Sequence, residues 1–89
     1  MTFEFDPDKS AVNKAKHGID FVEAQALWLD ERLQEVMSKA SVRNERRFLA
    51  IGQIDIRHWT AIWTLRGDAV RIISVRRSRR EEIDYYEGP

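Results

Sequence analysis

The chain has 89 residues, which is enough for one small domain. It contains no cysteine, which excludes disulfides, thiolate metal sites and cysteine nucleophiles. Its 15 basic and 15 acidic residues give a net charge of zero, which argues against a simple polybasic coat for nucleic acid.

The sequence has no feature typical of export or of membrane insertion. No apolar run approaches the roughly 18 residues that a membrane span requires. The segment Met1–Asp6 is acidic and lacks the basic start of a signal peptide. We therefore expect a cytoplasmic protein.

The N-terminal third predicts a short strand and two helices. Phe3–Phe5 alternates apolar and acidic residues, as a strand does. Asp6 is placed as the N-cap of a helix, with Pro7 at its first position. This helix should run to about His17, with Gly18 as a left-handed C-cap.

A second helix is expected to begin at Asp20 and to end near Asp30. Asp20 and Glu23 have the spacing of a capping box, in which each side chain bonds the other residue's backbone. An apolar face follows at helical spacing. It consists of Phe21, Ala24, Leu27 and Trp28.

The middle of the chain predicts strands joined by short links. Such links favour antiparallel pairing, because parallel neighbours need longer crossovers. A central antiparallel sheet with helices on one face is therefore expected. Its strands are Arg47–Gln53, Trp59–Leu65 and Val70–Val75, preceded by a short strand at Leu33–Met37 and a polar loop over Ser38–Asn44.

The last helix is expected over about Ser78–Tyr86, with Ser78 as N-cap and Glu81 completing a capping box. Four arginines surround its start, where the helix dipole disfavours cations. Glu82 and Asp84 come too late in this helix to compensate them. The cluster therefore favours an anion site, with phosphate as the best occupant. The alternative is neutralisation by distant acids such as Glu4, Asp6 or Asp8. The arginines are Arg76, Arg77, Arg79 and Arg80.

Between Arg57 and Arg80 every Lys or Arg position holds arginine, and the one acid is Asp68. Arginine binds phosphate through a planar two-pronged fork and stacks on bases, which suits RNA. A solvated charged face is the alternative explanation. On the RNA hypothesis, Arg71, Arg79 and Arg80 are candidate RNA-binding residues.

Two further groups could take part in chemistry. Lys16 and His17 end the first predicted helix, where a histidine suits general acid–base work but can also simply cap the helix. In the run from Glu45 to Arg47, the carboxylate of Glu45 could act as a general base held by the neighbouring arginines, or it could form an ordinary salt bridge at the edge of a strand. The two histidines are far apart in sequence, and neither ligand spacing nor a glycine-rich phosphate loop is present, so no metal and no cofactor are expected.

A set of residues spread over essentially the whole chain occurs together in one known family. The set comprises Phe5-Asp6-Pro7, Lys9, Asn13, Lys16-His17-Gly18-Ile19, Phe21, Glu23-Ala24, Glu45-Arg46-Arg47-Phe48, Ile51-Gly52, Thr64–Gly67, Arg71-Ile72-Ile73-Ser74, Arg76-Arg77, Arg80-Glu81 and Tyr85-Tyr86-Glu87. In this order the residues resemble the BrnT family of ribonuclease toxins, whose fold is similar to that of RelE-type toxins. The chain departs from the family pattern at Trp63, where a tyrosine is commoner.

The resemblance implies an α+β fold, in which a small antiparallel sheet packs against N-terminal helices and a C-terminal helix. It also implies a metal-independent endoribonuclease that inhibits translation and growth. A ribbon-helix-helix antitoxin would neutralise it, and the complex, in which the toxin could be dimeric, would repress its own operon through the antitoxin's contact with DNA. By position, the implied functional residues are Lys16, His17, Glu45, Arg46, Arg76, Arg77 and Tyr85.

The expected reaction is attack of the RNA 2′-OH on the adjacent phosphate. Glu45 or neutral His17 would be the base, and Lys16, His17 or Tyr85 the acid. Arg46, Arg76 and Arg77 would stabilise charge on the phosphate. The alternatives are a non-catalytic module that binds nucleic acid or a partner, and a degenerate toxin that acts only as a corepressor.

Overall fold

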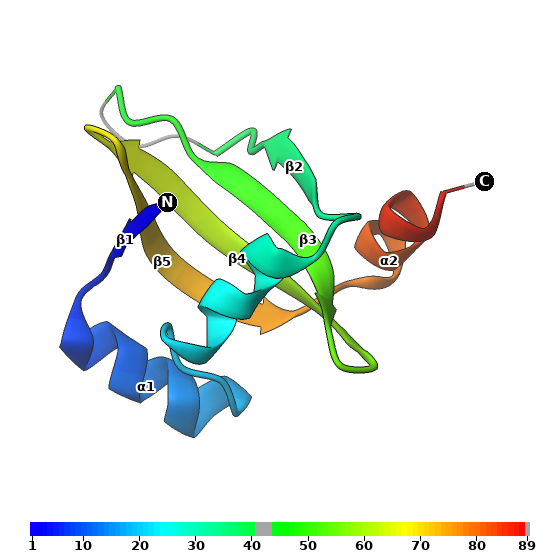
Figure 1. Cartoon of the computed structure of the whole chain (residues 1–89), viewed down its shortest axis with the longest axis horizontal. Helices are drawn as coiled ribbons and strands as arrows, with labels where there is room; N and C mark the ends of the chain where they lie inside the picture. Colours follow the sequence, from blue (N-terminus) through cyan, green and yellow to red (C-terminus); the bar gives the residue numbers. More distant parts are fainter. Residues whose placement is uncertain (41–43, 89) are drawn as a thin grey trace.

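Five strands form one sheet in the order β1-β5-β4-β3-β2 (Figure 1). The computed structural model describes residues 1–40 and 44–88, so residues 41–43 of the predicted loop 38–44 lie outside the described part. The α+β fold class is confirmed. The elements are β1 (Thr2–Glu4), α1 (Pro7–His17), the 3-10 helix η1 (Glu23–Leu29), β2 (Gln34–Met37), β3 (Phe48–Ile54), β4 (Arg57–Arg66), β5 (Ala69–Arg77) and α2 (Arg80–Glu87).

The three central strands pair antiparallel, as the short links predict. Asp55 and Ile56 join β3 to β4, and Gly67 and Asp68 join β4 to β5. The backbone at Asp55 and at Gly67 has positive φ, of 56° and 60°, which is typical of tight hairpin turns. The sequence did not indicate that β1 pairs with β5, in parallel, at the edge of this sheet.

The predicted ends of α1 are confirmed. The Asp6 carboxylate accepts a hydrogen bond from the Asp8 N–H at 2.9 Å, and Gly18 adopts φ 83° and donates its N–H to the Lys14 carbonyl. At 11 residues, α1 is the longest helix in the described part of the chain, and none of the helices there is long and apolar enough to cross a membrane.

The second helix was predicted over Asp20–Asp30, and the structure has a helix within that range, the 3-10 helix η1, which is three residues shorter at its start. The predicted capping box is nevertheless present: the Asp20 N–H bonds Glu23 Oε1 at 2.9 Å, and the Glu23 N–H bonds Asp20 Oδ1 at 2.7 Å. The buried side chains of Phe21, Ala24 and Leu27 are spaced by three residues. Three residues per turn place such a series on one face, which explains the tighter helix.

The core lies between η1 and one face of the sheet. Phe21, Ala24 and Leu27 belong to the same buried cluster as Trp59 and Trp63 of β4. Thr60 lies between Trp59 and Ala61 in sequence and therefore points to the opposite face, where Glu82 at the start of α2 bonds its hydroxyl. The prediction that all helices share one face is therefore wrong for α2.

Along the second half of β5, the side chain of Asn13 makes the backbone hydrogen bonds that a neighbouring strand would otherwise make. β1 pairs only with residues 69–71 of β5, which leaves the Val75 backbone without a neighbouring strand on that side. The Asn13 side-chain oxygen accepts from the Val75 N–H at 3.2 Å, and its amide donates to the carbonyls of Val75 at 2.9 Å and Ile19 at 2.8 Å. These bonds fix α1 beside β5, although the buried residues of α1 are both polar, Ser10 and Asn13.

Candidate functional site

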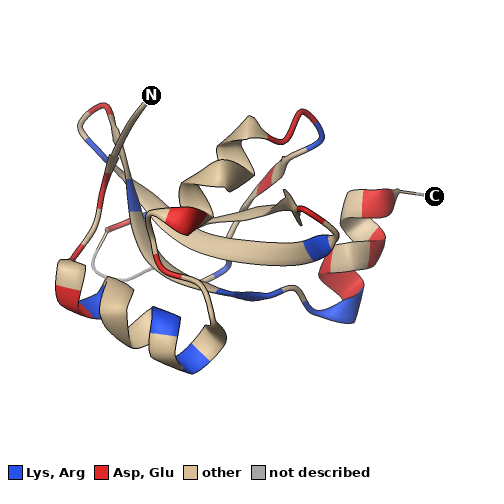
Figure 2. Cartoon of the chain, turned by 60° about the horizontal axis from the view of Figure 1, so that its bottom comes forward, with Lys and Arg blue, Asp and Glu red and all other residues tan. Residues whose placement is uncertain are grey.

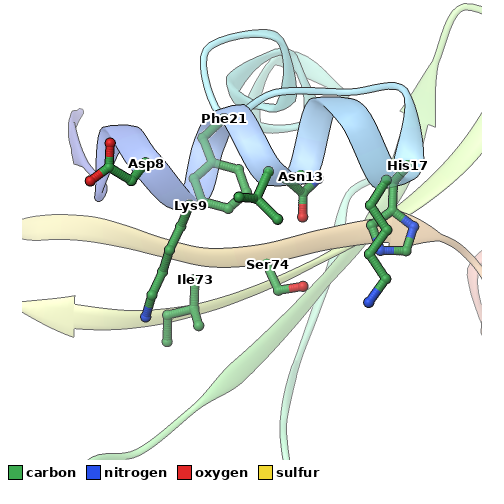
Figure 3. A pocket seen from close by; sticks show the side chains of 9 residues that line it. Asp8, Lys9, Asn13, His17, Phe21, Ile73 and Ser74 are labelled. Atoms are coloured by element: carbon green, nitrogen blue, oxygen red, sulfur yellow. The ribbon is translucent and has the colours of Figure 1, made fainter.

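A groove with a volume of about 300 Å³ lies between α1 and β5. Figure 3 shows the Lys9 side chain extending from α1 across β5 to the vicinity of Ile73, and the His17 ring over β5 at the end of the helix. Helix and strand run in the same direction, so His17 lies toward the carboxyl end of β5. The groove therefore combines an apolar floor with amino, imidazole and hydroxyl groups. Its lining consists of Asp8, Lys9, Val12, Asn13, Lys16, His17, Phe21, Ile73 and Ser74.

The spacing along α1 explains why these side chains share the groove. Lys9, Asn13 and Lys16 are separated by four and three residues, which places them on one face of the helix. Asn13, bonded to Val75, turns that face toward β5. Lys14 points elsewhere and pairs with Glu23 at 2.8 Å, whereas Lys16 forms no ion pair with any residue in the described ranges. The structure thus brings together Lys16 and His17 as a pair that lines an open groove.

Arg76 is held by a two-pronged ion pair with Glu82. Its Nη1 and Nη2 donate to Glu82 Oε1 and Oε2 at 2.7 and 2.8 Å. Oε1 also accepts from the Thr60 hydroxyl at 3.0 Å and from the Arg79 N–H at 2.7 Å. Burial alone would raise the pKa of Glu82, but the bonds from Arg76, Arg79 and Thr60 lower it to about 2. Its bond to Glu82 raises the pKa of Arg76, so the pair is ionised at neutral pH and is lost only in strong acid, where Glu82 is protonated.

The start of α2 differs from the prediction by one residue. The N-cap is Arg79 rather than Ser78, and Glu82 rather than Glu81 bonds the N-cap N–H. The Ser78 hydroxyl is engaged with Thr60 instead, at 2.8 Å. Because of this displacement Glu81 and Glu82 both lie in the first turn, where acids complement the helix dipole.

The predicted cluster of four uncompensated arginines is reduced to two, because Arg77 and Arg79 alone have no acidic partner among the residues that the structure describes. Arg76 is paired with Glu82, Arg77 lies 5.5 Å from the centre of the Trp59 ring, and Arg80 contacts Asp84 at 3.3 Å. The acids proposed as the alternative are used elsewhere: Glu4 binds Arg71 at 3.2 Å and Asp6 caps α1. Figure 2 shows basic segments along α1 and at the junction of β5 with α2, and acidic segments on α2 itself.

The predicted residues Glu45, Arg46 and Arg47 lie at the other end of the sheet. The Arg46 carbonyl accepts from the Thr64 hydroxyl at 2.6 Å, and Glu45 contacts Arg47 at 3.6 Å and Arg66 at 3.8 Å. Thr64 is four residues from Thr60 on β4, which corresponds to about 13 Å along the strand. The structure therefore does not bring Glu45 and Arg46 together with Arg76.

Tyrosines 85 and 86 have different surroundings on α2. Tyr85 is 56% exposed, whereas Tyr86 is buried and donates its hydroxyl to the Asp30 carboxylate at 2.7 Å. Burial and this bond raise the pKa of Tyr86 to about 12. Sequence reasoning missed both Tyr86 and Glu82. Their spacing of four residues, which places them on one helix face, was the available signal.

Comparison with known families identifies the family to which the chain belongs. The model of the family described as ribonuclease toxin, BrnT, of type II toxin–antitoxin system matches residues 5–82. This span includes α1, the groove and the Arg76–Glu82 pair. A search of curated proteins found no match. Within the described ranges, no three His, Asp or Glu side chains are grouped so that they could hold a metal ion.

The depressed pKa of Glu82 predicts a pH-dependent loss of stability. A carboxylate with a lowered folded-state pKa stabilises fully above its usual value of 4.5, and this contribution disappears as the pH falls toward 2. At pH 7, Glu82→Gln should lower the free energy of unfolding by roughly 1–3 kcal/mol after solvent screening. Urea unfolding should show the difference from wild type shrinking below pH 4.5. Exposed Glu81→Gln is the control, and an equal difference at pH 7 and pH 2.5 would refute the assignment.

Proposed function

Because the chain belongs to the BrnT family of ribonuclease toxins of type II toxin–antitoxin systems, we propose that it cleaves RNA internally, without a metal ion, in the groove between α1 and β5. The observation that carries this proposal is the position of Lys16 and His17 in a groove whose other wall, Ser74, lies two residues from Arg76 on β5. A proton-transfer group and a phosphate-binding group thus lie on neighbouring elements.

The proposed reaction transfers the phosphate within the RNA chain. The 2′-oxygen bonds to phosphorus while the bond from phosphorus to the 5′-oxygen breaks, giving a 2′,3′-cyclic phosphate and a 5′-hydroxyl. Neutral His17 takes the 2′-OH proton, and Lys16 gives a proton to the leaving 5′-oxygen. No redox step or co-reactant is needed.

The positions of the other candidates support this choice. Glu45 is already paired with two arginines and lies at the far end of the sheet, so it is a poor base for a phosphate beside Arg76. Tyr85 is exposed on α2. Arg76 stabilises the charge that develops on the phosphate, and Arg77 assists at the end of the same strand. Arg71, Arg79 and Arg80, with Arg46 at the far end, contact the RNA backbone on either side.

Substitution of His17 or Lys16 by alanine should lower RNA cleavage by about 100- to 10,000-fold while leaving folding intact. Cleavage of purified RNA in EDTA is the measurement, and formation of a cyclic phosphate identifies the chemistry. Lys14→Ala is the matched control, because Lys14 is on the same helix but pairs with Glu23 outside the groove. Full activity of a folded His17→Ala variant would remove the histidine from the mechanism. RNA binding without any cleavage by wild type would favour a corepressor.

The antitoxin is proposed to be a ribbon-helix-helix protein that inhibits the toxin and represses the operon with it. A row of half-buried aliphatic side chains crosses the sheet on the face opposite η1: Val36, Leu49 and Ile62 are register neighbours on β2, β3 and β4. An apolar antitoxin segment covers this row, and acidic residues at its rim contact the basic groups beside the groove.

Such docking makes inhibition competitive with RNA. Increasing antitoxin should displace a non-cleavable RNA analogue from the toxin, and the association rate should fall as salt rises. Titration followed by fluorescence anisotropy of labelled RNA measures both effects. A stable complex of toxin, RNA and antitoxin with unchanged RNA affinity would mean that the antitoxin docks elsewhere.

A further inference from the structure

Glu82 occupies only one edge of the Arg76 guanidinium. It accepts from Nη1 and Nη2, and Nη1 also donates to the Arg77 carbonyl at 3.3 Å. The opposite edge, formed by Nε–H and the second hydrogen of Nη2, has no partner among the residues that the structure describes, and Nε is not sealed from solvent. This free edge is a two-donor fork of the kind that matches two phosphate oxygens.

Glu82 is itself fixed in place. Its side chain is only 10% exposed, and its Oε1 accepts from the hydroxyl of Thr60, which is fully buried, and from the Arg79 N–H. A carboxylate held by β4 and by the start of α2 cannot follow the guanidinium if that group moves. The plane of the Arg76 guanidinium is therefore set by two elements other than its own strand.

Arg76 does not line the groove that contains the proposed reaction, but it follows the groove residue Ser74 on β5. Arg76 and Ser74 are two residues apart on β5 and point to the same face, with Cα atoms about 7 Å apart. Ser74 lines the groove together with Lys16 and His17 (Figure 3). A phosphate that spans from the free edge of Arg76 to Ser74 would reach the end of this groove.

We propose that Glu82 is a positioning residue: it holds Arg76 so that the Nε edge of the guanidinium is presented to the phosphate of the RNA. This inference rests on the proposed function, because it requires that Arg76 binds the reacting phosphate. Glu82 touches no substrate and acts entirely through Arg76. A flexible arginine would bind the phosphate in many orientations, and a fixed one needs no reorganisation during the reaction.

A double-mutant cycle tests the proposal. Glu82→Gln should lower kcat for RNA cleavage by about 10- to 100-fold with a much smaller change in KM. In an Arg76→Ala background the same substitution should have no further effect, because Glu82 then has nothing to position. Glu81→Gln, which removes the same charge from the neighbouring exposed residue, should cleave RNA like wild type.

The line width of the Arg76 Nε–H resonance in NMR reports how rigidly the guanidinium is held. A change in the stability of a folded variant does not by itself alter this line width. The resonance should be single and sharp in wild type and broaden in folded Glu82→Gln. Thr60→Val removes one hydrogen bond to Glu82 and no charge, so this variant should broaden the resonance less and lower kcat less. If Glu82→Gln does not fold, Thr60→Val provides the test in its place.

The outcomes separate this inference from the function on which it rests. Normal cleavage by Arg76→Ala would refute the role of Arg76 and with it the positioning. Loss of cleavage in Arg76→Ala with normal cleavage in Glu82→Gln would refute the positioning alone. Faster cleavage or tighter RNA binding by Glu82→Gln would mean that Glu82 masks Arg76. An equal loss in both backgrounds would mean that it supports the fold.

Discussion

The open backbone edge of β5 is the constraint on which the proposed site depends. Beyond residue 71 this strand has no neighbour on the β1 side, and an unpaired buried backbone group is costly. Asn13 meets that requirement with a side chain, bonding both the N–H and the carbonyl of Val75. A helix rather than a strand therefore lies along this edge. Its polar face, with Lys16 and His17, becomes the wall of a groove instead of a solvated surface.

The second constraint acts on the other face of the sheet. α2 is joined to the rest of the fold largely through polar groups: Glu82 bonds Thr60 and Arg76 of the sheet, and Tyr86 bonds Asp30 at the end of η1. Each bond couples the helix to a different part of the fold, and the bond to Arg76 connects it to the end of β5. The same contacts that anchor the helix also orient the arginine. The stability of α2 and the orientation of Arg76, the proposed phosphate-binding group, are thus linked through one carboxylate, Glu82.

The features that the sequence predicted correctly are those that depend on residues close together in the chain. The caps of α1 depend on Asp6, Pro7 and Gly18 alone, and the hairpins depend on short links, so both were confirmed. Long-range partners were not predictable in this way. The parallel pairing of β1 needs a contact across more than 60 residues, and the bond of Ser78 to Thr60 displaced the start of α2 by one residue. That displacement brought Glu82 into the first turn and changed the interpretation of the arginine cluster.

RNA is expected in the groove between α1 and β5, and NMR of the protein with an uncleavable RNA can locate it. An oligonucleotide with 2′-deoxyribose at the scissile position lacks the attacking hydroxyl, so it binds without reacting. Its titration should shift the side-chain resonances of Lys16, His17 and Arg76 together, at one affinity. Shifts confined to Glu45, Arg46 and their neighbours, with the groove between α1 and β5 unaffected, would mean that RNA binds at the other end of the sheet.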